Sequence, residues 1–222
     1  MQSSDSYIPA LKFAWLTPCY DFVVATTTRE KRFKRRLLQQ ASLQPGWDVL
    51  DLGSGTGTLA LWAKQAQPAA RIVGLDGDPQ ILEIARRKAR KRRCEIEFRE
   101  GLSYRLPFED NSFDCVLSSL FFHHLVPDDK RATLVEVRRV LRPGGELHIA
   151  DWGAAVGPVS RALFRAVQRL DGEANTIDHV TGRFQDYLSQ AGFQQVEVRE
   201  SFFTVYGVLS LFRGYRNSES ET

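Results

Sequence analysis

A glycine-rich loop is the part of this sequence that is best suited to hold a ligand. Residues 47–52 form a short, mostly apolar run that predicts a buried strand. Gly53, Gly55 and Gly57 follow it directly, before a helical pattern starts. Glycine lets the chain turn tightly and lets a ligand lie against bare backbone amides at a helix N-terminus. Because residues 55–60 also satisfy a dinucleotide-binding fingerprint, the glycines alone do not identify the ligand, and a tight turn without a ligand is the alternative.

Two carboxylates near this loop limit which ligand fits. Asp76 ends the next predicted strand, where it can accept hydrogen bonds from both hydroxyls of a ribose. Asp51 lies two residues before Gly53, where the pyrophosphate of a dinucleotide would come close to it. Like charges about 4 Å apart, at an effective dielectric constant near 20, repel by about 4 kcal/mol. The pair therefore favours a cationic nucleoside without phosphates, which describes S-adenosylmethionine, over NAD.

Four segments, in order along residues 47–151, resemble the motifs of one enzyme family. Residues 49–57, VLDLGSGTG, resemble the first signature of class I S-adenosylmethionine-dependent methyltransferases, and residues 73–76, VGLD, resemble their ribose-binding strand end. Residues 106–116, LPFEDNSFDCV, and 141–147, LRPGGEL, are similar to two signatures of the small-molecule branch that includes the ubiquinone/menaquinone biosynthesis methyltransferases. The resemblance implies methyl transfer, with S-adenosylmethionine as cofactor and S-adenosylhomocysteine as product.

The residues that we expect to bind the cofactor lie in the glycine loop and at the ends of neighbouring strands. They are Asp51, Gly53, Ser54, Gly55, Gly57, Asp76, Gly77, Leu102 and Ser118. One position departs from the family, because Leu102 follows Gly101 where an aspartate commonly contacts the adenine amino group. The adenine would then be bound by a backbone carbonyl, Glu100 or Ser103.

The candidate catalytic residues follow the fourth and fifth predicted strands. Methyl transfer from a sulfonium is an in-line displacement, so the protein mainly aligns the reactants and excludes water. His123 and His124 carry imidazoles, whose ordinary pKa suits them to take a proton from a phenol or an activated carbon acid. Because consecutive side chains face opposite ways, at most one is expected to act. Asp151 ends the fifth strand and is expected to orient the acceptor, and packing or backbone hydrogen bonding is the alternative role for all three.

Aromatic side chains are expected to form an apolar pocket for the methyl acceptor. The residues assigned to it come from the N-terminal segment and the two loops: Tyr7, Tyr20, Phe122 and Trp152. The alternative is that they pack a lid or close the core. We expect no metal site, since adjacent histidines without a third ligand do not build a coordination shell.

The elements that must position these residues alternate along the chain. Apolar runs predict strands at residues 48–52, 71–76, 95–100, 114–118, 146–151, 195–201 and 203–211. Amphipathic patterns predict helices at residues 57–66, 79–90, 128–141 and 182–191. The link between the last two strands is too short for a crossover helix, so they are expected to pair as an antiparallel hairpin. The predicted fold is therefore α/β, a doubly wound, Rossmann-like sheet of seven strands, mostly parallel with an antiparallel last strand.

The predicted organisation is one domain with additions. We expect a helical N-terminal extension or lid over residues 1–46, the cofactor-binding domain over 47–216, and a flexible polar tail over 217–222. An acceptor-side insertion over 153–181 is expected to contain one amphipathic helix near 159–170.

Composition excludes several other classes of protein. The chain is 43% hydrophobic and 26% charged, which is ordinary for a globular protein. A net charge of +3 is too small to imply a nucleic-acid partner, and three widely spaced cysteines encode neither a disulfide framework nor a zinc site. The start lacks the features of a signal peptide and no apolar run is long enough to span a bilayer, so a cytoplasmic location is expected.

Two basic runs leave open whether the protein contacts an anionic surface. Residues 86–93 lie at the C-terminal end of a predicted helix, on the side opposite the cofactor, and are expected to be solvated. Residues 29–36 contain the apolar Phe33 and are followed by Leu37 and Leu38. This pattern predicts an amphipathic helix able to make peripheral membrane contact.

The favoured function is methylation of a small apolar or aromatic acceptor, quinone-like or phenolic. The alternatives are N-methylation of a phospholipid amine at a membrane surface and non-catalytic binding of S-adenosylmethionine. A nicotinamide oxidoreductase is less favoured, because of the charge at Asp51. Nucleic-acid modification is also less favoured, since residues 118–121, SSLF, lack the motifs of DNA methyltransferases. The oligomeric state stays open.

Overall fold

The structure is a computed structural model that describes residues 30–154, 157, 173–204 and 207–218. Tyr7 and Tyr20, assigned above to the acceptor pocket, lie outside the described residues, and so does the helix expected near residues 159–170. The predicted lid over residues 1–46 is described only from residue 30 onward.

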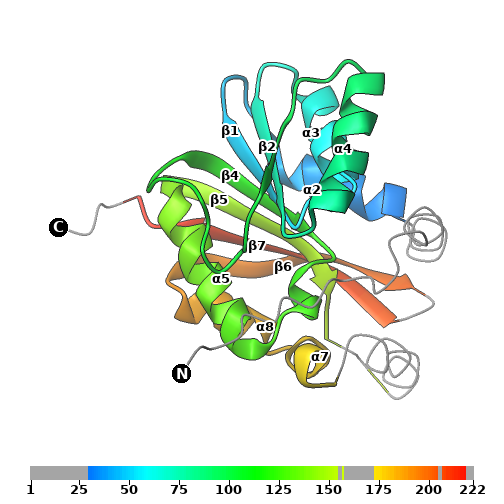
Figure 1. Ribbon diagram of the computed structural model, residues 1–222. Coiled ribbons are helices and arrows are strands. Elements are labelled where there is room, and N and C mark those ends of the chain that lie inside the picture. Colours follow the sequence, from blue (N-terminus) through cyan, green and yellow to red (C-terminus); the bar gives the residue numbers. More distant parts are fainter. Residues whose placement is uncertain (1–29, 155–156, 158–172, 205–206, 219–222) are drawn as a thin grey trace, which may run out of the picture.

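A seven-stranded sheet runs through the molecule (Figure 1). Its strands are β1 (Asp48–Leu52), β2 (Arg71–Asp76), β3 (Glu97–Glu100), β4 (Phe113–Ser119), β5 (Leu141–Trp152), β6 (Phe193–Thr204) and β7 (Gly207–Arg216). The order across the sheet is β3-β2-β1-β4-β5-β7-β6. Strands β1 to β5 pair in parallel, and β7 is antiparallel to both β5 and β6. The predicted α/β sheet, with its antiparallel last strand, is confirmed.

Helices cover both faces of this sheet. They are α2 (Glu30–Ala41), α3 (Thr58–Ala66), α4 (Pro79–Lys91), the short 3₁₀ helix η2 (Phe122–His124), α5 (Pro127–Val140), α7 (Glu173–Val180) and α8 (Phe184–Gln190). One apolar core joins the sheet to α2, α3 and α4, and a second joins it to α5 and α8 (Figure 1). Among the described residues, no helix is both long and apolar enough to cross a membrane.

Local signals in the sequence explain where several helices begin and end. Asp78 accepts hydrogen bonds from the amides of Gln80 (2.8 Å) and Ile81 (3.3 Å), and Pro79 occupies the first helical position of α4. Gly192 follows the end of α8 with a φ of 87°, which confirms the left-handed cap expected there.

The N-terminal basic run forms the predicted amphipathic helix, α2. Phe33 and Leu37 are buried in the core between this helix and the sheet. Two of its cations contact β6 of the same chain: Arg36 donates to Glu200 at 2.7 Å, and the Arg32 guanidinium lies 5.5 Å from the centre of the Phe202 ring. These cations are therefore used, at least in part, to hold the helix on the edge of the sheet.

The structure differs from the sequence prediction at several places along the chain. The link predicted between residues 201 and 203 is wrong, because β6 continues to Thr204, with Phe202 buried and Phe203 exposed as alternation in a strand requires. Strand β5 starts at Leu141, which pairs with Phe113 before residues 142–145 bulge out of the ladder. Within the 153–181 insertion, α7 is a helix that the hydrophobic pattern did not predict.

The ring of Phe98 supports the glycine loop from beneath. A Cβ atom placed on Gly57 would lie 2.8 Å from Cζ of this ring, and one placed on Gly74 would lie 2.7 Å from its Cδ1. Both distances are shorter than real contacts, so the ring fills space that only glycine leaves. The close packing of β2, β3 and the loop thus depends on one aromatic side chain.

We expect Phe98→Ala to lower the free energy of unfolding by about 3–5 kcal/mol, because it opens a cavity under the loop. The matched control is Phe203→Ala on β6, where the side chain is 76% exposed and the change is expected to stay within about 0.5 kcal/mol. Urea unfolding followed by circular dichroism measures both. Equal losses for the two variants would contradict the supporting role of Phe98.

Candidate functional site

The glycine loop between β1 and α3 is built from left-handed residues. Gly53, Gly55 and Gly57 have φ angles of 67°, 51° and 74°, which side chains rarely adopt. The turn is closed by the Gly57 amide, which donates to the Ser54 carbonyl at 2.9 Å, and the Ser54 amide ties the loop to Leu75 of β2. A Cβ atom on Gly55 would meet nothing within 4 Å, so the loop is open to a ligand at this residue.

Asp76 joins the end of β2 to this loop. Its carboxylate accepts hydrogen bonds from the amides of Gly55 (2.8 Å) and Asp78 (3.0 Å). Burial raises the pKa of Asp76, while these amides act in the opposite direction. A carboxylate has about four lone-pair positions, so two amides leave it able to accept from ribose hydroxyls as well. Gly77, which was expected beside it, is half-buried at the same strand end.

Asp51 belongs to β1, and its side chain reaches the beginning of α3. It is buried and accepts a hydrogen bond from the Ala60 amide at 2.9 Å. Burial raises the pKa of Asp51 to about 7, although the charge of Lys34 on α2 and the Ala60 amide lower it. The first turn of this helix, where a phosphate commonly binds, thus already has a carboxyl group as its acceptor.

A hydroxyl in the loop also fits a polar ligand. The Oγ atom of Ser54 is buried and has no hydrogen-bond partner among the described residues. Buried hydroxyls are nearly always hydrogen-bonded, so such a group indicates a bound ligand or water. Ser118, expected at the same site, is also buried, but its hydroxyl donates to the Leu52 carbonyl at 3.0 Å and so ties β4 to β1.

The region expected to bind adenine follows β3. Leu102 is half-buried and begins a small turn, in which its carbonyl accepts from the Arg105 amide at 3.1 Å. The hydroxyl of Ser103 is buried and lies 2.8 Å from that of Thr133 on α5. Because Ser103 is used in this way, Glu100 and the backbone carbonyls are the better candidates to receive the adenine amino group.

Beyond the ends of β4 and β5, the structure brings Asp151 and His123 together. The Asp151 carboxylate is fully buried at the end of β5 and lies 2.7 Å from Nδ1 of His123. It also accepts from the amides of Trp152 (2.7 Å) and Phe121 (3.2 Å). Burial alone would raise the pKa of Asp151, but the neighbouring His123 and these donors hold it well below its ordinary value. An ionised Asp151 can only accept, so Nδ1 carries the proton and Nε2 is the basic nitrogen of His123.

His124 has a different environment from its neighbour. Its ring is half-buried, with its centre 4.0 Å from that of His123, and its carbonyl accepts from the Asn175 side chain of α7 at 3.3 Å. The two imidazoles therefore differ in burial, and the ring of His123 lies within hydrogen-bonding distance of the Asp151 carboxylate.

Two aromatic residues expected in the acceptor pocket lie in the apolar cores of the described structure. Phe122 is completely buried, and its ring centre lies 5.3 Å from that of Phe184 on α8. Trp152 is 5% exposed and belongs to the core beneath α2 and α3. Phe121, directly before Phe122, packs its ring against Gly53. A Cβ atom on Gly53 would lie 2.3 Å from Cδ2 of this ring.

The sequence did not reveal three buried ionisable residues close to this site. Lys130 on α5 and Asp178 on α7 are both buried, with Nζ 2.7 Å from one carboxylate oxygen. Burial lowers the pKa of Lys130, and the hydrogen bond that Lys130 donates to Asp178 opposes that shift. His179, also buried, lies with its Nδ1 2.7 Å from the Trp152 carbonyl. No motif links Lys130 to the adjacent pair Asp178 and His179, because they come together only in the folded chain.

Comparison with known proteins identifies the family. Residues 49–145 match the family described as a methyltransferase domain. A demethylmenaquinone methyltransferase of Thermus thermophilus is 37% identical over 161 residues, which cover 70% of this chain and 72% of that protein. The ubiquinone/menaquinone biosynthesis C-methyltransferase of an Enterobacter species is 30% identical over 206 residues, covering 83% and 80% of the two chains.

A solved structure shows the same fold at low sequence identity. The Haemonchus contortus phosphoethanolamine N-methyltransferase 2 in complex with S-adenosyl-L-methionine gives a TM-score of 0.72 at 16% identity, over 92% of this chain and 57% of that one. Together with the glycine loop and the strand-end carboxylates, these matches confirm the resemblance seen in the sequence. The chain belongs to the class I S-adenosylmethionine-dependent methyltransferases and resembles the enzymes of quinone biosynthesis.

Proposed function

We propose that this protein transfers the methyl group of S-adenosylmethionine to a small apolar or aromatic acceptor, quinone-like or phenolic, by in-line displacement. Bound S-adenosylmethionine supplies an electrophilic methyl group on a sulfonium and becomes S-adenosylhomocysteine. The observation that carries the proposal is the hydrogen bond between Gly55 and Asp76. It joins an open, left-handed glycine loop to a strand-end carboxylate in a chain that belongs to the methyltransferases.

The residues of the loop fit this cofactor in three respects. The space at Gly55 is open, the Ser54 hydroxyl has no partner among the described residues, and Asp76 retains lone pairs for ribose hydroxyls. The carboxyl group of Asp51 already accepts from the Ala60 amide in the first turn of α3, so a pyrophosphate would lose that donor and meet a carboxyl group there. This supports a nucleoside without phosphates.

The chain's own contribution to the transfer is positioning and proton removal. Asp151 fixes the ring orientation and the tautomer of His123, which leaves Nε2 to take the proton that a phenol or an activated ring carbon gives up. His124 is the alternative base, because it lies next to His123 and is more exposed.

The acceptor class is supported by the relatives. Two of them are named for methylation of demethylmenaquinone or for ubiquinone and menaquinone biosynthesis. The phospholipid-amine alternative draws less support, since Arg32 and Arg36 of the basic helix contact β6 of the same chain. Flotation with anionic vesicles separates the two, because only a membrane-docked enzyme is expected to bind them.

We expect Asp76→Ala to weaken binding of S-adenosylhomocysteine about 10- to 150-fold, because hydrogen bonds to a charged group contribute about 1.5–3 kcal/mol. Isothermal titration calorimetry measures the dissociation constant. The control is Glu83→Ala on the exposed face of α4, which is expected to leave it unchanged. An unaltered dissociation constant for the Asp76 variant would contradict the ribose assignment.

We expect His123→Ala to lose about 10²- to 10⁴-fold in turnover, the usual contribution of a general base, while its affinity for S-adenosylhomocysteine stays within twofold. Transfer of tritiated methyl groups to phenolic and hydroquinone acceptors measures turnover, and calorimetry measures affinity.

The same substitution at His124 decides which imidazole acts. A larger loss at His124 than at His123 would show that the Asp151-bound ring is not the base. If the unaltered protein binds S-adenosylhomocysteine but transfers no tritium to any acceptor, it is a non-catalytic binder instead.

A further inference from the structure

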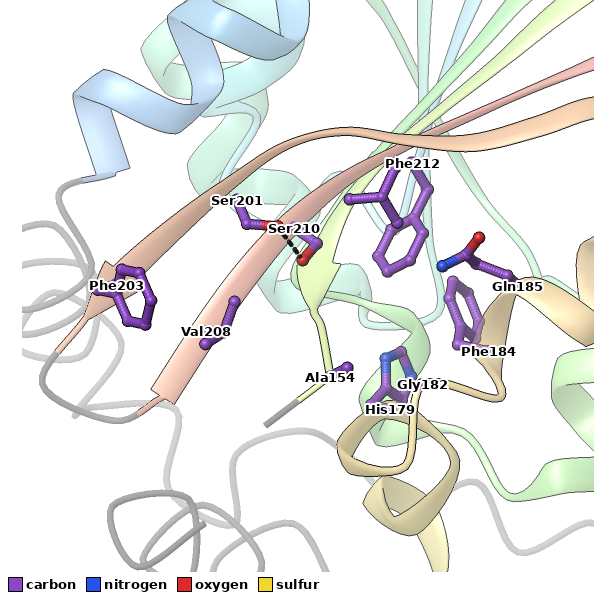
Figure 2. Close-up of a pocket in the computed structure, with 11 residues that line it drawn as sticks. Ala154, His179, Gly182, Phe184, Gln185, Ser201, Phe203, Val208, Ser210 and Phe212 are labelled. Atoms are coloured by element: carbon purple, nitrogen blue, oxygen red, sulfur yellow. Dashed lines mark hydrogen bonds between the residues drawn. The ribbon is translucent and has the colours of Figure 1, made fainter. Parts of the chain in front are cut away.

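A cavity of about 170 Å³ lies between the β6–β7 hairpin and the α7–α8 segment, beside the end of β5 (Figure 2). Its walls are mainly apolar: Phe184 of α8 and Phe212 of β7, whose ring centres lie 5.2 Å apart, form one end, and Val208 of β7 lies towards the other. An apolar cavity of about 150 Å³ in another protein is known to hold benzene. The size and walls of this cavity therefore suit one aromatic ring.

His179 is the polar group that sets this cavity apart from an ordinary packing gap. Its ring is fully buried, lines the cavity and stacks on Phe184, with ring centres 4.3 Å apart and planes 20° from parallel. Nδ1 lies 2.7 Å from the Trp152 carbonyl, which can only accept, so Nδ1 carries the proton. Nε2 has no hydrogen-bond partner among the described residues.

The ring of His179 is neutral near pH 7. Burial lowers its pKa to about 4, with the charge of Lys130 acting in the same direction and that of Asp151 against it. Neutral imidazole with a protonated Nδ1 has a lone pair on Nε2. The cavity therefore offers a hydrogen-bond acceptor, and a ligand that satisfies it must bring a donor.

The other polar groups around the cavity require few further hydrogen bonds from a ligand. The hydroxyls of Ser201 and Ser210 lie 2.8 Å apart and satisfy each other across the hairpin (Figure 2). Gln185 is half-buried at the α8 side. Phe203 and Val198, also in the lining, are 76% and 38% exposed, which gives the cavity an apolar mouth. A fitting ligand is thus an apolar ring with a single donor group.

We propose that this cavity is a subsite that receives a phenolic ring of the methyl acceptor, with the phenol hydroxyl donating to Nε2 of His179. That the ring belongs to the acceptor rests on the proposed function, whereas the binding of a phenolic ring does not.

The place of the cavity in the fold connects it to the candidate base. The Trp152 carbonyl binds His179, and the amide of the same residue donates to Asp151, the partner of His123. A single residue of β5 thus separates the two sites along the backbone. Phe184, which forms one wall, also packs against Phe122 in the loop that contains His123.

Phenol and toluene test the site without any cofactor, because they share a ring and differ in the donor. We expect the unaltered protein to bind phenol about 2- to 12-fold more tightly than toluene, as measured by ligand-observed NMR titration; this is the usual net contribution of one hydrogen bond. Equal affinity for the two probes would overturn the proposal.

Two variants locate the binding. His179→Phe keeps a ring against Phe184 but removes the acceptor nitrogen, and it is expected to abolish the preference for phenol. Val208→Phe fills the cavity and leaves His179 intact, and it is expected to abolish binding of both probes. Circular dichroism and urea unfolding verify that each variant folds. A folded Val208→Phe variant that still binds phenol, or a folded His179→Phe variant that still prefers it, would overturn the assignment.

Turnover with a naphthohydroquinone acceptor tests whether the ring is that of the acceptor. For His179→Phe we expect a KM raised about 2- to 12-fold, with little change in kcat and an unchanged affinity for S-adenosylhomocysteine. An unchanged KM, together with a lost phenol preference, would overturn the acceptor assignment. If the unaltered protein transfers no methyl group to any acceptor, the proposed function fails, while a preference for phenol still establishes the cavity as a phenol site.

Discussion

The site at the end of β5 depends on the burial of one carboxylate. A fully buried, ionised Asp151 is costly unless hydrogen bonds replace the water it has lost. The bonds come from the loop after β4, through the Phe121 amide and the His123 ring, and from the Trp152 amide next along β5. Because the carboxylate requires all of these donors, it fixes the loop against the strand. The orientation of His123 is a consequence of that requirement.

The same loop connects the acceptor side to the cofactor side. The position of Phe121 is set by the hydrogen bond that its backbone amide donates to Asp151. Its ring packs so closely on Gly53 that any side chain at that position would collide with the ring. Gly53 therefore meets two demands, a left-handed φ and a close approach of another ring. A ligand in the glycine loop would border on residues that are held by Asp151, so the two sites are expected to respond to each other.

The sequence predicted features whose causes are local. The three glycines, the carboxylates at strand ends, the Asp78 cap and the Gly192 cap each depend on residues a few positions apart, and all lie where the pattern placed them. Lys130 and Asp178 are 48 residues apart and pair only in the folded chain. Helix α7 was missed for a related reason, since its inward face carries Thr176, Asp178 and His179, and polar residues give no signal of burial to a hydrophobic pattern.

Asp51 shows how an expectation about a site can rest on incomplete physics. From the sequence, its charge alone disfavours a phosphate at the glycine loop. In the structure its pKa is raised to about 7, so the charge is only partly present at neutral pH. The carboxyl group also accepts a hydrogen bond from the Ala60 amide, in the turn of α3 where a phosphate would bind. The Ala60 amide is occupied whether or not Asp51 is ionised, so part of the preference for a phosphate-free nucleoside does not depend on the charge.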